Sequence, residues 1–276
     1  MSKFRIRSSL QTLAGIGASL LCLLAAGSAL AQDATPAARE PLREERSFRL
    51  PAGRPIDVEN RYGSVFVRFG GYEHQFDLQT TQQQPEGAPA IEVESAAHDG
   101  VFKVVVRMPA GASLAEGQRM DLVLYVPQAH SLRVVTTFGG IESRGVKSDI
   151  DLQSESGDIT ARGTAGRLRL HSDDGNLQAA IDGAARAGEQ RLSTRTGNIA
   201  LGVTDALDAD IRMRSSGLLT TDYSLEIAHR DGEEPNKDAQ LAVGKPAQGE
   251  QRATIVLESR AGAIQLLRRA VFVETP

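Results

Sequence analysis

Residues able to do chemistry are few in this sequence and are spread along it. The five histidines include no His-x-x-x-His pair and no cluster with metal-ligand spacing. His171 comes closest to a catalytic group, because Asp173 and Asp174 follow it. Strand alternation would place His171 on the solvent side and the two aspartates in a turn, so we expect a solvated turn rather than a site.

Acidic residues could instead bind calcium or cleave glycans. Asp158, Asn176 and Asn198 recur at one position of a repeat. They offer one carboxylate and two amides to an ion that prefers six to eight oxygens, and their types suit turn geometry. The outward-facing acids are scattered rather than grouped on one face, as glycan cleavage would need. A Gly-x-Ser-x-Gly elbow and a phosphate loop are also absent, so we expect no enzyme activity, no metal and no cofactor.

Residues 1–31 have the pattern of a cleaved secretory signal peptide. Three basic residues precede an apolar stretch, Leu13–Ala26, and Ala29–Ala31 supplies the small residues before a cut. A retained membrane anchor is the alternative, but the stretch is interrupted by glycines and is short for a span. The only cysteine, Cys22, lies inside it, so the mature chain can form no disulfide. Residues 32–46 are rich in alanine, proline and charge, which predicts a disordered lead-in.

The composition of the mature chain excludes several classes of protein. Without residues 1–31, 28 basic and 35 acidic side chains remain, which argues against a nucleic-acid-binding protein. Tryptophan is absent and aromatic residues make up 4%, which argues against pockets built on stacked rings. No later apolar stretch reaches membrane length. We therefore expect an exported protein that is periplasmic, on the cell surface or secreted, with no integral membrane segment.

One repeat organises the chain: apolar-x-apolar-x-Ser/Thr-x-x-Gly-x-Ile/Leu, found six times. The fifth copy is one residue shorter between its hydroxyl residue and its glycine. The hydroxyl residues are Thr136, Ser154, Ser172, Thr194, Ser215 and Ser259. The glycines are Gly139, Gly157, Gly175, Gly197, Gly217 and Gly262.

Each copy is typical of two short strands around a corner. The hydroxyl could bond nearby backbone and hold the turn, and the glycine could supply a positive φ. Because one copy cannot bury its apolar edge alone, copies must stack, and Arg133, Asp151 and Arg169 would then form a column of alternating charge. We predict a single-domain, all-β, parallel β-solenoid of the β-helix kind. A β-sandwich of antiparallel hairpins is the alternative, but it gives no reason for one residue type to recur at one position.

The repeat also sets the domain boundaries. Residues 47–127 should form an irregular N-terminal β cap, within which Ile56–Val65 is a degenerate copy of the repeat. Residues 128–270 carry the repeats, and the polar stretch 228–252 should loop out as an insertion. Phe138 and Tyr223 stand where other copies have small or polar residues. They are candidates for a partner contact, with packing of a cap as the alternative.

The run Val126-Pro127, then Leu132-x-Val134-x-Thr136-x-x-Gly139-x-Ile141, followed by repeated Ser/Thr-x-x-Gly-Asp/Asn-Ile/Leu, resembles the exported putative-adhesin family, domain of unknown function 4097. The resemblance covers residues 48–268 and rests on structural turn motifs. It implies a β-solenoid at the bacterial cell surface or in the envelope, with no established catalytic residues to carry over. Some members of the family accompany envelope-stress systems.

We therefore expect a non-enzymatic adhesin or binding scaffold of the cell envelope. Its partner would be an envelope protein, a peptide or a glycan whose identity the sequence does not give. A periplasmic binding module associated with envelope stress is the first alternative. A glycan-active enzyme is the second.

Overall fold

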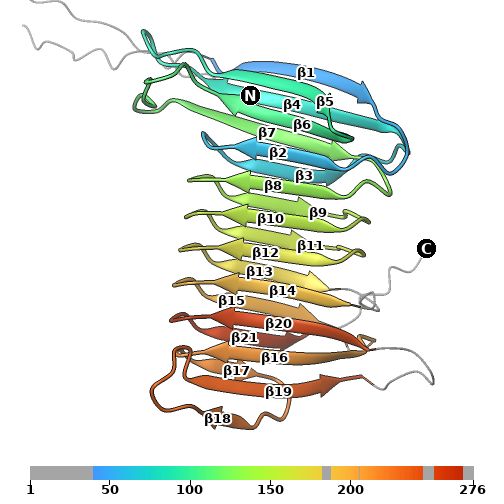
Figure 1. The fold of residues 1–276 in the computed structure, drawn as a ribbon, viewed down its shortest axis with the longest axis vertical. Helices are drawn as coiled ribbons and strands as arrows, with labels where there is room; N and C mark the ends of the chain where they lie inside the picture. Colours follow the sequence, from blue (N-terminus) through green and yellow to red (C-terminus); the bar gives the residue numbers. More distant parts are fainter. Residues whose placement is uncertain (1–39, 182–187, 205, 245–251, 270–276) are drawn as a thin grey trace, which may run out of the picture. The chain divides into compact units, whose positions relative to one another are not determined.

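The computed structural model describes residues 40–181, 188–204, 206–244 and 252–269. The predicted signal peptide, 1–31, lies outside these residues. The described residues form two large, mostly parallel β-sheets and contain no helix (Figure 1). The chain is therefore all-β, as predicted.

Sheet A is the ten-stranded sheet and sheet B the eleven-stranded one. In spatial order, sheet A contains β1 (Leu42–Arg49), β4 (Gln75–Gln83), β7 (Arg119–Val126), β3 (Val65–Phe69), β9 (Ile141–Arg144), β11 (Ile159–Arg162), β13 (Leu177–Ile181), β15 (Ile199–Val203), β21 (Ile264–Arg268) and β17 (Leu219–Thr221). Sheet B, from its opposite edge, contains β18 (Ile227–His229), β19 (Lys237–Val243), β16 (Ala209–Ser215), β20 (Ala253–Ser259), β14 (Glu189–Thr194), β12 (Leu168–Ser172), β10 (Ile150–Ser154), β8 (Leu132–Thr136), β2 (Ile56–Asn60), β6 (Val101–Arg107) and β5 (Glu92–His98).

Each repeat contributes one strand to sheet B and the next strand to sheet A; we call such a pair with its turn a coil. Neighbouring coils pair in parallel and in register, so that Leu152 faces Leu170 and Leu170 faces Leu192. All three side chains are almost fully buried. The alternative of antiparallel hairpins is therefore wrong for the repeats.

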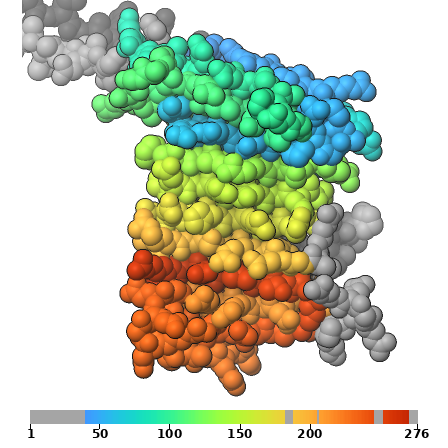
Figure 2. Space-filling model, viewed as in Figure 1, coloured from blue at the N-terminus to red at the C-terminus, as the bar shows by residue number. Residues whose placement is uncertain are grey.

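The coils do not follow one another in chain order. The last coil, β20–β21, lies between the fourth repeat, β14–β15, and the fifth, β16–β17. Figure 2 shows the last coil as a red band between the lighter orange fourth repeat and the orange fifth repeat. At the other end, the degenerate copy β2–β3 lies between β8–β9 and β6–β7. Both early and late segments of the chain are thus enclosed by segments from its middle.

The repeat glycines act through close packing rather than through a special φ. None of the six has a positive φ, so that prediction was wrong. Instead, a Cβ on Gly157 would lie 2.1 Å from the carbonyl oxygen of Gly139, and one on Gly175 would lie 2.1 Å from that of Gly157. The backbones of adjacent turns lie so close that there is no room for a side chain.

The repeat hydroxyls bridge these stacked glycines. Ser172 Oγ accepts a hydrogen bond from the Gly175 amide (2.9 Å) and donates one to the Gly157 carbonyl of the neighbouring coil (3.0 Å). Ser154, Thr194, Ser215 and Ser259 make the same two contacts. The bridges follow the spatial order of the coils, because Ser259 reaches Gly197 and Ser215 reaches Gly262. Thr136, in the first repeat, donates instead to the carbonyl of its own turn glycine, Gly139, at 2.7 Å.

Two segments predicted to lack structure contain strands. Leu42–Arg46, expected in the disordered lead-in, belongs to β1, which pairs antiparallel with β4. Lys237–Val243, expected in a looped-out insertion, forms β19, which pairs antiparallel with β16 over seven residues. β1 is the edge strand of sheet A, and β19 lies next to β18, the edge strand of sheet B. Near the end of a sheet, pairing uses backbone groups and needs few apolar side chains. Part of the predicted insertion, 245–251, lies outside the described residues.

The glycine packing gives the first testable prediction. Gly157→Ala should lower the free energy of unfolding by at least about 2 kcal/mol, because the new methyl group would overlap a backbone carbonyl that cannot move without shifting a coil. Gly140→Ala is the matched control, since its Cβ would meet only Asp158 O, at 3.2 Å. Urea unfolding of the three proteins measures the difference. Equal losses for both variants would show that the turns are not closely packed.

Candidate functional site: a charged groove on sheet B

A column of alternating charge crosses the outer face of sheet B. Asp57, Arg133, Asp151 and Arg169 occupy the same position on β2, β8, β10 and β12. The predicted column of Arg133, Asp151 and Arg169 is therefore present, and β2 extends it by one residue. Arg133 Nη1 lies 3.3 Å from Asp57 Oδ1. Such exposed pairs contribute little stability, so the column matters more for what it offers a partner.

A groove of about 350 Å³ runs beside this column. Its charged lining comprises three arginines and three aspartates, and therefore has no net charge: Asp57, Arg133, Asp149, Asp151, Arg167 and Arg169. Arg167 pairs with Asp149 in the neighbouring turn, at 2.8 Å. Asp151 accepts a hydrogen bond from Gln153, at 3.0 Å.

Arg169 differs from the other arginines of the groove. Its side chain is exposed and has no hydrogen-bond or ion-pair partner among the described residues. Its register neighbour Asp151 is bonded to Gln153, and its other neighbour, Arg191, pairs with Glu258 at 2.7 Å. A planar guanidinium in this state can bind a carboxylate or a phosphate through two hydrogen bonds. The groove thus has one position ready for an anionic group.

The stacked Asp158, Asn176 and Asn198 serve the fold. Asp158 Oδ1 accepts the backbone N–H of Asn176 at 2.7 Å, and Asn176 Oδ1 accepts that of Asn198 at 3.0 Å. Asn198 Oδ1 continues the ladder to Ala263, at 2.8 Å. These oxygens are therefore occupied by amides. Among the described residues, no group of three or more His, Cys, Asp or Glu side chains could hold a metal ion.

His171 has a contact that the sequence did not suggest. Its Nδ1 lies 2.9 Å from Ser193 Oγ, and its Nε2 lies 3.5 Å from Asp173 Oδ1. The sequence does not indicate this contact, because Ser193 belongs to the next coil and is 22 residues away. The residue types match a hydrolytic triad. However, the side chains of His171 and Asp173 are 50% and 51% exposed, and none of the three lines the groove, so a substrate would meet an open strand face.

The two predicted contact residues lie apart. Phe138 is in the turn between β8 and β9 and is 75% exposed. Tyr223 follows β17, the strand at the far edge of sheet A. Its ring packs against the core, and Arg268 Cζ lies 4.8 Å from the ring centroid. Phe138 therefore remains available to a partner, whereas Tyr223 packs within the fold.

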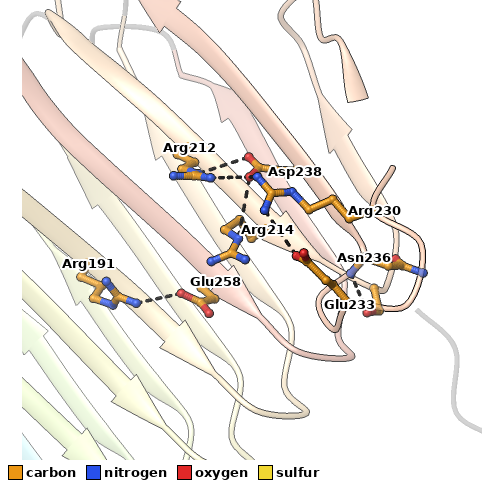
Figure 3. A network of polar contacts seen from close by, with 9 residues as sticks. Arg191, Arg212, Arg214, Arg230, Glu233, Asn236, Asp238 and Glu258 are labelled. Atoms are coloured by element: carbon orange, nitrogen blue, oxygen red, sulfur yellow. Dashed lines mark hydrogen bonds and ion pairs between the residues drawn. The ribbon is translucent and has the colours of Figure 1, made fainter. Parts of the chain in front are cut away.

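A second charged cluster lies where β19 covers the end of sheet B (Figure 3). The Asp238 side chain is only 6% exposed and accepts hydrogen bonds from Arg212 and Arg230, the latter at 2.9 Å, with Arg214 close by. The hydrogen bond from Arg212 lowers the pKa of Asp238, against the opposing effect of burial, and the charges of the three arginines add to the lowering. This cluster fixes β19 on β16.

Comparison with known proteins supports the fold only. No known protein family and no curated protein matches the sequence. The structure resembles that of a putative cell adhesion protein from Clostridium sporogenes, with a TM-score of 0.51 and 12% identity over 83% of this chain and 100% of the other. A putative adhesin from Bacteroides fragilis gives a TM-score of 0.41 at 13% identity, over 82% of this chain and 97% of the other. The chain thus shares its fold with the clostridial protein.

Among the residues of this chain that the structure describes, no helix is long and apolar enough to cross a membrane.

The Asp238 cluster gives the second prediction. A carboxylate whose pKa is lowered on folding stabilises the folded state above its unfolded pKa, and this contribution is lost as the pH falls through the folded pKa. Asp238→Asn should therefore lower the free energy of unfolding at pH 7 by about 1–3 kcal/mol. The free energy of unfolding of the variant should also fall less than that of the parent as the pH is lowered. Denaturant unfolding between pH 2 and pH 7 measures both effects.

Glu233→Gln is the control for this experiment. Glu233 pairs with Arg230 at 3.3 Å, but its side chain is 58% exposed, so its loss should cost little. An Asp238→Asn variant with the parent's pH profile would contradict the role assigned to the buried carboxylate.

Proposed function

We propose that this chain is an exported, non-enzymatic β-solenoid that acts as an adhesin or binding scaffold in the bacterial cell envelope. Two observations support the architecture: the repeats pair in parallel and in register, and the fold is shared with the clostridial protein described as a putative cell adhesion protein. The signal-like residues 1–31 support export. The observation that carries the binding role is the charged groove on sheet B, in which Arg169 has no partner among the described residues.

The groove suits recognition because its charges lie on a rigid scaffold. Asp57, Arg133, Asp151 and Arg169 each project from a strand that is paired on both sides. The neighbouring apolar side chains of Ile56, Leu132 and Ile150 are buried, which anchors these strands to the core. Electrostatic complementarity of this kind determines which partner binds and how fast more than how tightly. We expect a ligand with one anionic group at Arg169 and polar groups along the rest of the groove.

A charge reversal tests the groove. Arg169→Glu should reduce binding of the purified mature chain to envelope fragments from a deletion strain by about tenfold or more, because it places a like charge against the ligand's anionic group. The matched control is Arg162→Glu, which reverses an exposed arginine on sheet A that donates a hydrogen bond to Gln178. Co-sedimentation at two salt concentrations measures both. Equal binding by the two variants would exclude the groove as the binding surface.

Fractionation of the producing cells separates the adhesin from the periplasmic module. Retention of the chain at the cell surface, accessible to added protease in intact cells, is expected of the adhesin. Release with the periplasmic fraction would favour a module associated with envelope stress. Both roles could use the same groove, so this experiment concerns location and not the groove itself.

The contact between Ser193 and His171 gives a direct test of the non-enzymatic proposal. Open exposure of His171 and Asp173 leaves nothing to exclude water or to position a substrate, so the purified chain should hydrolyse p-nitrophenyl acetate no faster than its Ser193→Ala variant. Turnover that disappears with Ser193→Ala would show that the three residues form a working site.

A further inference from the structure

The chain's first and last repeat-like coils are enclosed on both sides. In a stack built in chain order, the last coil would lie at an end and pair on one side only. Here β20 pairs with β14 over six residues and with β16 over seven. Its companion β21 pairs with β15 over five residues and with β17 over three.

The other end has the same arrangement. β2 pairs with β6 over four residues and with β8 over five, and β3 pairs with β7 over five and with β9 over four. Only β1, an exposed edge strand, precedes β2 among the described strands. Neither terminal coil can leave without separating four strand ladders, two on each of its strands.

Burial strengthens the C-terminal coil further. Ile255, Leu257, Ile264 and Leu266 have no exposed surface. Removing this coil would therefore expose its own apolar side chains and also the faces of the coils above and below it. The hydroxyl bridges from Ser259 to Gly197 and from Ser215 to Gly262 would break in the same event.

Chain ends are normally the least stable part of a repeat protein. They fray because each terminal unit has one neighbour, and an applied force removes such units one after another. Enclosing the terminal coils removes this weak point. Tension on the C-terminus acts first on β21, which has strands on both sides, rather than on an edge.

We propose that this chain has a mechanical function: it bears tension between its two ends as one unit, without losing terminal coils. This proposal is independent of the groove and of any ligand. A protein that links a cell surface to a partner would need this property, because force reaches it through the chain ends.

Single-molecule force spectroscopy tests the proposal on the mature chain. The mature chain has no cysteine of its own, so Ala52→Cys gives a unique attachment point in the exposed turn between β1 and β2, and the second handle follows Pro276. We expect β20–β21 to remain in place until the main rupture. An early step at low force that releases about 6 nm, the length of residues 252–269 at about 3.5 Å each, would overturn the proposal.

A matched pair of variants shows whether enclosure is the cause. Leu257→Ala removes buried contacts of β20 and should create the early step, whereas Val256→Ala, on the same strand but facing outward, should not. An unchanged force trace for a folded Leu257→Ala variant would contradict this cause, because it would show that the buried contacts of β20 do not hold the coil in place.

Hydrogen exchange of the unmodified chain provides a measurement that needs no variant. The amides of β20 and β21 should exchange as slowly as those of β10 to β13. Faster exchange at β20 and β21 would show that the terminal coil frays, which also contradicts the proposal.

Discussion

The structure depends on backbone-to-backbone contact at the stacked turns. Where one coil turns from sheet B to sheet A, its glycine lies directly on the carbonyl of the glycine in the neighbouring coil. In five of the six repeats a serine or threonine hydroxyl accepts a hydrogen bond from the amide of its own turn glycine and donates one to the carbonyl of the neighbouring glycine. Because this buried polar contact is satisfied at each of these steps, the strands on either side can stay in register at the spacing of about 4.8 Å.

This constraint separates the residues that build the fold from those free to do something else. Inward positions must be apolar and turn positions must be glycine with a hydroxyl, but outward positions on sheet B need only tolerate exposure. The column from Asp57 to Arg169 lies on such positions, and so does the contact between His171 and Ser193. A groove assembled from four successive strands can therefore vary in charge without disturbing the stack, which suits a scaffold whose task is to bind.

The periodic part of the sequence predicted the periodic part of the structure. Alternation placed Leu152, Leu170 and Leu192 in one layer. The degenerate copy Ile56–Val65 pairs in the predicted register with the first repeat, so that Ile56 lies beside Leu132. The order of the coils could not be predicted, because each copy presents the same edges to any neighbour. The positive φ predicted for the repeat glycines is wrong, because what requires glycine there is close contact with another coil and not the conformation of its own turn. Alternation placed Arg169 in its column, but whether it has a partner within the described part of the chain depends on the side chains of neighbouring strands.

Crosslinking of introduced cysteines tests the stacking order most directly. Ser193 of β14 faces Glu258 of β20, and Glu258 faces Arg214 of β16. Ser193→Cys with Glu258→Cys therefore places two thiols on adjacent strands, within the range of Cα separations that a disulfide spans, whereas Ser193→Cys with Arg214→Cys places them two strands apart, beyond it. We predict that mild oxidation closes the first pair and leaves the second open. Rapid closure of the second pair with none in the first would mean that the coils stack in chain order and that the architecture described here is wrong.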